Sequence, residues 1–92
     1  MPLTVVYTRR FTKSLKRVKQ FKGFKESKLA NVIEMLANRT RLPEQFRDHA
    51  LAGDVSGYRE CHISPDILLI YEIKNDILVC SLTDIGNHSQ LF

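Results

Sequence analysis

Residues 58–83, YRECHISPDILLIYEIKNDILVCSLT, contain three apolar runs separated by two short polar tripeptides. The runs cover residues 58–63, 67–73 and 77–83. Their β-branched and aromatic side chains favour strands. The tripeptides at 64–66 and 74–76 are short enough to form hairpin connections. This stretch therefore predicts a three-stranded antiparallel meander.

Two amphipathic helices are predicted before the meander. Thr8 is a suitable N-cap for a helix that begins near Arg9, and Gly23 marks the turn to a second helix over residues 25–38. Apolar side chains recur at helical spacing in both segments. They are Phe11, Leu15 and Val18 in the first, and Leu29, Val32, Ile33, Leu36 and Ala37 in the second. Pro43 excludes a continuation of the second helix.

The resulting order, β-α-α-β-β-β, predicts an α+β fold in which residues 1–92 form a single domain. Residues 3–8, LTVVYT, supply the first strand and complete one edge of a small, mostly antiparallel sheet. The helical pair covers one face of this sheet. The opposite face is then expected to be open to water and available to a large ligand.

The positive charge is concentrated in the first half of the chain. Residues 1–41 hold eleven Lys or Arg against two acids, whereas residues 42–92 hold three against eight. Such a distribution favours a polyanionic partner, because clustered cations bind backbone phosphates whatever the sequence. A solvated helix face explains the same lysines equally well.

The composition also predicts where the protein resides. No apolar run is long enough to span a bilayer, so no membrane partner is expected, and the N-terminus does not resemble a signal peptide. Cys61 and Cys80 lie in apolar runs outside any CxxC pair, which indicates buried, reduced thiols. A cytoplasmic location is therefore predicted.

The candidate chemistry lies in the second half, which holds all three histidines. Side chains alternate along a strand, so His62 faces the open side of the sheet if Cys61 faces the helices. Metal-free RNA cleavage needs a base for the ribose 2′-OH, an acid for the leaving 5′-oxygen and a cation for the phosphate. These types are supplied by His49, His62, Asp66, His88 and Arg59. Each histidine taken alone is better explained as a surface or hydrogen-bonding residue.

No metal or other cofactor is expected, because no two histidines have the spacing of a preorganised zinc site. The chain ends on an apolar pair, Leu91-Phe92. Leu91 is expected to dock on the core. Phe92 either docks as well or stacks on an unpaired base.

Four linked motifs occur in order over residues 48–92. They are a DHxLxG loop, a GYRxxHxxPD strand and turn, an apolar LLIY strand and a terminal GxHxxLF. In these motifs the chain closely resembles the YafQ branch of the RelE/ParE toxin superfamily. The basic first half fits the same RelE-like layout but carries little identifying detail.

The resemblance implies a type II toxin, an endoribonuclease that cleaves mRNA in the ribosomal A site. A cognate antitoxin would neutralise it in a hetero-oligomer, and the basic half would attract that antitoxin and the ribosome. The RNA-binding cations expected there include Lys13, Lys16 and Arg17.

The resemblance also assigns roles to individual residues. The catalytic positions fall on His49, His62, Asp66 and His88, and the terminal aromatic on Phe92. His88 resembles the general acid, whereas Asp66, His49 or His62 would be the base. Arg59 matches the arginine of the GYR motif, as a phosphate ligand or as a structural residue.

One position departs from the family pattern. Members of this branch commonly carry an arginine four residues before the last histidine, and this chain has Asp84 there. A carboxylate would repel the scissile phosphate, unless another cation compensates or Asp84 pairs with His88.

Two other functions remain open. A toxin-fold protein of this kind could act by binding a protein, as ParE-type relatives do with gyrase, or be only weakly active as an enzyme. A simple RNA-binding module would explain the basic helices but not the aligned histidines.

Overall fold

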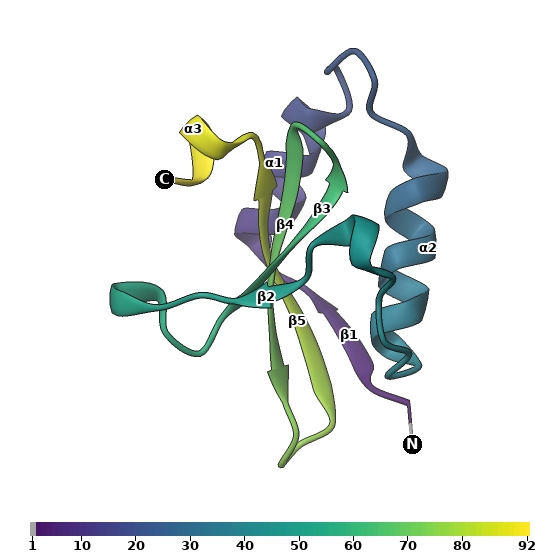
Figure 1. Cartoon of the computed structure of the whole chain (residues 1–92), viewed down its shortest axis with the longest axis vertical. Helices are drawn as coiled ribbons and strands as arrows, with labels where there is room; N and C mark the ends of the chain where they lie inside the picture. Colours follow the sequence, from purple (N-terminus) through teal and green to yellow (C-terminus); the bar gives the residue numbers. More distant parts are fainter. Residues whose placement is uncertain (1) are drawn as a thin grey trace.

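The computed structural model describes residues 2–92, except for the side chain of Val55. The elements are β1 (Thr4–Tyr7), α1 (Arg9–Val18), α2 (Glu26–Ala37), η1 (Glu44–Phe46), β2 (His49–Ala50), η2 (Gly53–Val55), β3 (Arg59–Ser64), β4 (Ile67–Lys74), β5 (Val79–Gly86) and α3 (His88–Leu91). The chain runs through α1 in one direction, turns near Gly23 and returns through α2 (Figure 1). Within residues 2–92, no helix has the length and apolar character that crossing a membrane requires.

The sheet has five strands in the order β1-β5-β4-β3-β2. β3, β4 and β5 form the predicted antiparallel meander, and β1 pairs in parallel with β5. The α+β prediction, with the first strand at a sheet edge, is therefore confirmed. β2 was not predicted, because two residues carry no readable alternation. It pairs with β3 through His49 opposite Glu60 and Ala50 opposite Arg59.

One apolar core lies between the helical pair and the sheet. It joins Phe11 and Val18 of α1 and Leu29, Val32 and Leu36 of α2 to Cys61, Ile63, Leu69, Tyr71, Leu82 and Ile85 of the strands. Thr8 is the N-cap of α1 as predicted, since its hydroxyl accepts the Phe11 N–H at 3.1 Å. The same hydroxyl donates to the Leu82 carbonyl at 2.7 Å and so ties the helix to β5. Cys61 and Cys80 are both free and fully buried.

The third strand of the meander differs from the prediction of residues 77–83. Ile77 lies in the turn and is 61% exposed, and Leu78 has a positive φ of 54°. This left-handed residue completes a turn longer than KND, so β5 begins at Val79. β5 then continues to Gly86, because Asp84 and Gly86 pair with Ile70 and Leu68 of β4.

The face opposite the helices, called the histidine face here, is less open than predicted. Leu68 and Ile70 are 3% and 9% exposed, yet neither belongs to the core cluster. Cross-strand partners share a face, so Leu68 lies between His62 and Gly86. Ile70 lies between Glu60 and Asp84 in the same way. The histidine face therefore has an apolar centre with ionisable side chains on either side.

Candidate active site

Three of the four predicted catalytic side chains line one hollow of about 960 Å³. They are His62 on β3, Asp66 in the β3–β4 turn and His88 at the start of α3. The first part of the α1–α2 connection also lines the hollow. The other lining residues are Gln20, Phe21, Lys22, Pro65, Leu68, Asn87 and Ser89. The structure thus brings three of the candidate residues to one hollow, which we call the catalytic groove after that prediction.

His88 is held by a short helix that the sequence analysis missed. Asn87 caps α3, because its side-chain oxygen accepts the Gln90 N–H at 2.9 Å while the Gln90 side chain accepts the Asn87 N–H at 3.0 Å. Gly86 makes this cap possible, since a Cβ there would lie 2.9 Å from Gln90 Oε1. The signal in the sequence was Asn-x-x-Gln immediately after a glycine.

Glu60 lies between two of the histidines. Its side chain is 8% exposed, and Oε1 lies 3.5 Å from His49 Nε2 and 3.9 Å from His62 Nε2. The Arg47 carbonyl lies 2.7 Å from His49 Nδ1. A carbonyl only accepts, so Nδ1 carries a proton, and an ion pair with Glu60 forms when Nε2 is protonated too. Glu60 was expected on this face but was not among the predicted site residues.

His49 itself does not line the catalytic groove, and its side chain is half-exposed. It reaches the site only through Glu60, because β2 places it opposite that residue. The four predicted catalytic residues are thus not equivalent. Three line the groove, whereas His49 contacts Glu60.

Asp84 has a cation beside it. Its Oδ2 lies 3.0 Å from Arg10 Nε, and its Oδ1 accepts the Ile85 N–H at 2.9 Å. Of the alternatives left open by the sequence, the structure therefore shows compensation by a cation of the first helix, although the residue is Arg10 and neither Arg59 nor a lysine. The edge of the sheet explains this contact. β1 ends opposite Leu82, so within residues 2–92 the part of β5 after Leu82 has no strand beside it on that side, and Arg10 of α1 reaches Asp84 there.

Arg59 lies on the helix side of β3, away from the histidines. It is opposite Tyr71, and its Nη2 donates to Asp48 Oδ2 at 2.9 Å. The Tyr71 hydroxyl donates to the other oxygen of the same carboxylate. The hydrogen bond to Asp48, followed by the one that Arg59 Nε donates to the Tyr71 hydroxyl at 3.4 Å, raises the pKa of Arg59, whereas burial, followed by the bond to Asp48, raises the pKa of Tyr71. This placement agrees with a structural role for Arg59.

The basic residues of α1 are exposed but do not line the catalytic groove. Lys13, Lys16 and Arg17 all point away from the core. The cation at the groove is Lys22, in the turn after α1. The sequence analysis missed it because nothing local marks one lysine among the eleven basic residues of residues 1–41.

Phe92 is 55% exposed, and its ring centroid lies 5.1 Å from that of His88. Leu91 is partly buried, and its side chain approaches Gly86. The tail thus docks through Leu91 while Phe92 presents a ring beside the proposed acid. Within residues 2–92, no three or more His, Cys, Asp or Glu side chains are arranged to hold a metal ion.

Comparison with known proteins gives consistent matches over nearly the whole chain. A family model described as the bacterial toxin of type II toxin–antitoxin systems, YafQ, matches residues 3–92. A YafQ toxin of Haemophilus influenzae is 37% identical, over 97% of this chain and 91% of its own length. The mRNA interferase toxin YafQ of Escherichia coli K12 is 34% identical, over 96% and 94%.

Solved structures agree with the sequence matches. A metal-bound toxin from Helicobacter pylori superposes with a TM-score of 0.89 at 38% identity, over 98% of this chain and 99% of its own. YafQ from E. coli BL21(DE3) gives 0.87 at 28% identity, over 98% of each chain. YafQ has also been solved in complex with DinJ, in a structure with a TM-score of 0.86 at 28% identity that covers 98% of both chains.

Proposed function

Because the chain belongs to the family of YafQ toxins of bacterial type II toxin–antitoxin systems, we propose that it cleaves mRNA in the ribosomal A site. The class of enzyme, an endoribonuclease, follows from the family, whose E. coli member is named an mRNA interferase. The observation that supports catalysis by this chain is the convergence of His62, Asp66 and His88 on one groove.

The groove supports metal-free acid–base cleavage. A base takes the proton of the ribose 2′-OH, the 2′-oxygen attacks the adjacent phosphorus, and the bond to the 5′-oxygen breaks. The products are a 2′,3′-cyclic phosphate and a free 5′-hydroxyl, whose proton comes from the acid. We assign the acid to His88 and the base to His62, which stand on different elements and approach the groove from different walls.

Glu60 and Asp66 support this pair. Glu60 is nearly buried beside His62 and favours one orientation of its ring. Its second neighbour, His49, places another cation near the site when protonated. Asp66 lines the groove from the turn and is within the same hollow as both proposed proton carriers, where it can orient a ring or the 2′-OH.

The ribosome would provide RNA contacts that the small groove alone does not. The exposed cations Lys13, Lys16 and Arg17 lie outside the groove, so they remain free to contact the phosphates of another RNA while the groove holds the message. Phe92, exposed beside His88, would stack on a base of the message.

A cognate antitoxin is the second proposed partner. E. coli YafQ has been solved in complex with DinJ, and this chain has the same fold over 98% of its length. A protein that covers the catalytic groove would silence the enzyme, so the hetero-oligomer is the expected resting form in the cytoplasm.

The test is primer extension on a translated message, with expression of the chain in the absence of antitoxin. Wild type is expected to arrest growth and to leave defined cuts within codons. His88→Ala should lower the cleavage rate about 100-fold or more, which is the usual contribution of a general acid. Unchanged far-ultraviolet circular dichroism and melting temperature would show that the variant is folded.

Two outcomes contradict the proposal. Full cleavage by a folded His88→Ala variant would show that His88 is not the general acid. Growth arrest with intact mRNA would contradict the ribonuclease function itself and favour action by protein binding, as in ParE-type toxins.

A further inference from the structure

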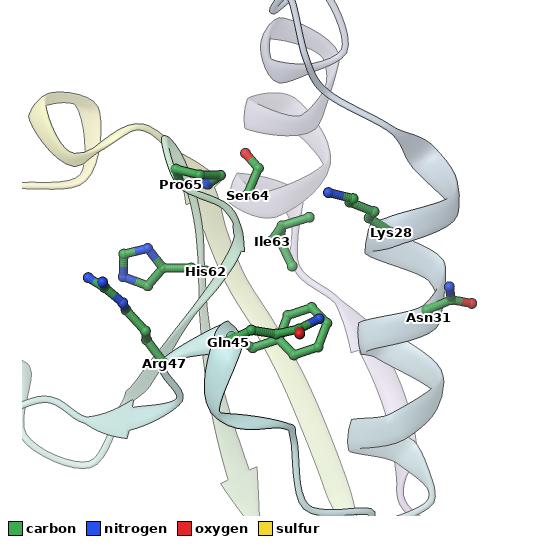
Figure 2. Close-up of a pocket in the computed structure, with 9 residues that line it drawn as sticks. Lys28, Asn31, Gln45, Arg47, His62, Ile63, Ser64 and Pro65 are labelled. Carbon is green, nitrogen blue, oxygen red and sulfur yellow. The ribbon is translucent and has the colours of Figure 1, made fainter.

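A second hollow adjoins the catalytic groove and takes no part in the proposed chemistry. It has a volume of about 610 Å³ and lies between α2, η1 and the end of β3. Figure 2 shows its walls, with Lys28 and Asn31 on α2 on one side and His62 and Arg47 on the other. The lining residues are Lys28, Asn31, Gln45, Phe46, Arg47, His62, Ile63, Ser64 and Pro65.

The chemistry of this lining suits a nucleotide. Lys28 and Arg47 are cations at opposite ends of the hollow, and no carboxylate is among its lining residues. Asn31 lies beside Lys28 on α2, Gln45 lies between that helix and Arg47, and each side-chain amide offers both a donor and an acceptor. Amides of this kind hydrogen-bond the edges of unpaired bases, while cations bind the flanking phosphates.

The two hollows share two lining residues. His62 and Pro65 line both of them, so the residue assigned as the base stands where the hollows meet. A strand with its scissile phosphate in the catalytic groove would therefore carry its next nucleotide past His62. The volume of the second hollow, about 610 Å³, falls within the range of about 300–1,000 Å³ that is typical of small-molecule sites.

The backbone at Arg47 links this hollow to the histidines. Arg47 has a φ of 49° and a ψ of 40°, a left-handed conformation that most side chains avoid. In this conformation its carbonyl lies 2.7 Å from His49 Nδ1 while its guanidinium lines the hollow near His62. One residue thus contacts the Glu60-linked histidine through its backbone and the second hollow through its side chain.

We propose that the hollow between α2 and η1 binds the first nucleotide beyond the two that flank the scissile phosphate, with its base against Asn31 and Gln45 and its phosphate against Arg47 or Lys28. The proposal rests on the ribonuclease function above. It implies that this chain distinguishes bases at one position near the cut, because each amide presents both a donor and an acceptor to the edge of a base.

The direct test uses 2′-O-methyl oligoribonucleotides of two to five nucleotides, which lack the attacking hydroxyl and cannot be cut. Fluorescence anisotropy at low salt measures their binding to the wild-type chain and to variants. Lengthening the probe beyond two nucleotides should tighten binding about tenfold, once the added base fills the hollow. Asn31→Ala and Gln45→Ala should abolish that gain and leave the dinucleotide affinity unchanged. Lys28→Ala should weaken the binding of every probe longer than two nucleotides.

Matched controls are available on the same helix. Asn38 is the C-cap residue of α2 and lies outside the hollow, so Asn38→Ala controls for the loss of an amide. Lys25 precedes α2 and is exposed, so Lys25→Ala controls for the loss of a charge. Both should keep the full gain with length.

A second measurement is the distribution of cuts on a translated message. The wild type should prefer certain bases at one position near the cut, and Asn31→Ala or Gln45→Ala should flatten that preference where Asn38→Ala does not. Equal length dependence and equal base preference in all these variants would overturn the proposal. So would variants that keep RNA binding and instead lose affinity for an acidic antitoxin peptide, since the hollow would then belong to that partner.

The two proposals fail in different ways. Length-dependent binding of the uncleavable probes without any cut in translated messages would contradict the ribonuclease function and support the nucleotide site. Cuts that depend on His88, with no gain from probe length and no base preference, would support the ribonuclease function and contradict the nucleotide site.

Discussion

The two faces of the sheet each hold a carboxylate between two partners, but they hold it differently. On the helix side, Asp48 accepts hydrogen bonds from both Arg59 and Tyr71, so each of its oxygens has a close donor. On the histidine face, Glu60 is more buried, yet its nearest partners are histidine nitrogens at 3.5 and 3.9 Å. The first cluster is held by hydrogen bonds, whereas the contacts of Glu60 with the two histidines are longer.

This difference separates a structural cluster from the one proposed to be catalytic. A hydrogen-bonded network stabilises the fold because its polar groups have partners. A loosely held pair of imidazoles keeps nitrogens that a substrate can reach, at a cost in stability. Asp48 and His49 are adjacent in the chain, so one short segment contributes to both clusters.

The largest effect is expected from Glu60→Gln, which removes the charge between the histidines and keeps the shape. The single-turnover cleavage rate on programmed ribosomes should fall about 100-fold, because a displaced imidazole no longer meets the 2′-OH. The concentration of toxin at half-saturation should stay unchanged, since Glu60 lies away from the exposed cations. Glu72→Gln on β4 is the matched control, paired with Lys74 outside the groove.

A higher toxin concentration at half-saturation, with an unchanged cleavage rate, would show that Glu60 acts in binding. No change in either quantity would mean that the histidine face works without its carboxylate, and the contrast between the two clusters would lose its functional meaning.

A smaller effect, on stability instead of rate, is expected from Asp48→Asn. The amide cannot hold both the Arg59 guanidinium and the Tyr71 hydroxyl as the carboxylate does, so the free energy of unfolding should fall by about 2 kcal/mol. Urea denaturation measures it, with exposed Asp54→Asn as the control. A fall in cleavage rate without a fall in stability would show that the helix-side cluster is catalytic after all.

The sequence predicted the large elements and the identity of the gathered groups, for physical reasons that can be named. Alternation in RECHI placed His62 opposite the core because Cys61 and Ile63 prefer burial, and both are buried. The turn at 64–66 followed from Pro65, which cannot continue a paired strand. These signals are local, so they survive in a single sequence.

What the sequence did not reveal depends on contacts between distant segments. β2 has two residues and α3 has four, so neither carries a period that could be recognised. The hollow beside α2 combines residues from the helix, η1 and β3, and no spacing in the chain marks them as neighbours. The partner of Asp84 is likewise 74 residues away, on α1.

The smallest expected effect concerns the Arg10–Asp84 pair. This pair is intermediate between the two clusters in the exposure of its side chains. Asp84 is buried like a structural carboxylate, with a side chain 9% exposed, but the Arg10 side chain is 74% exposed. Arg10→Ala leaves a buried charge without its cation and should lower the free energy of unfolding by about 1–2 kcal/mol. Exposed Arg9→Ala is the matched control and should have almost no effect.

The double variant Arg10→Ala with Asp84→Asn decides what the pair does. A neutral amide needs no cation, so the double variant should recover most of the lost stability, measured by urea denaturation as a double-mutant cycle. Cleavage should follow the same pattern, since a bare Asp84 in the cross-strand row of Glu60 would repel the phosphates of the message. Additive losses in the cycle would mean that the two side chains act independently. A double variant that regains stability but not cleavage would show instead that the Arg10 guanidinium itself contacts RNA.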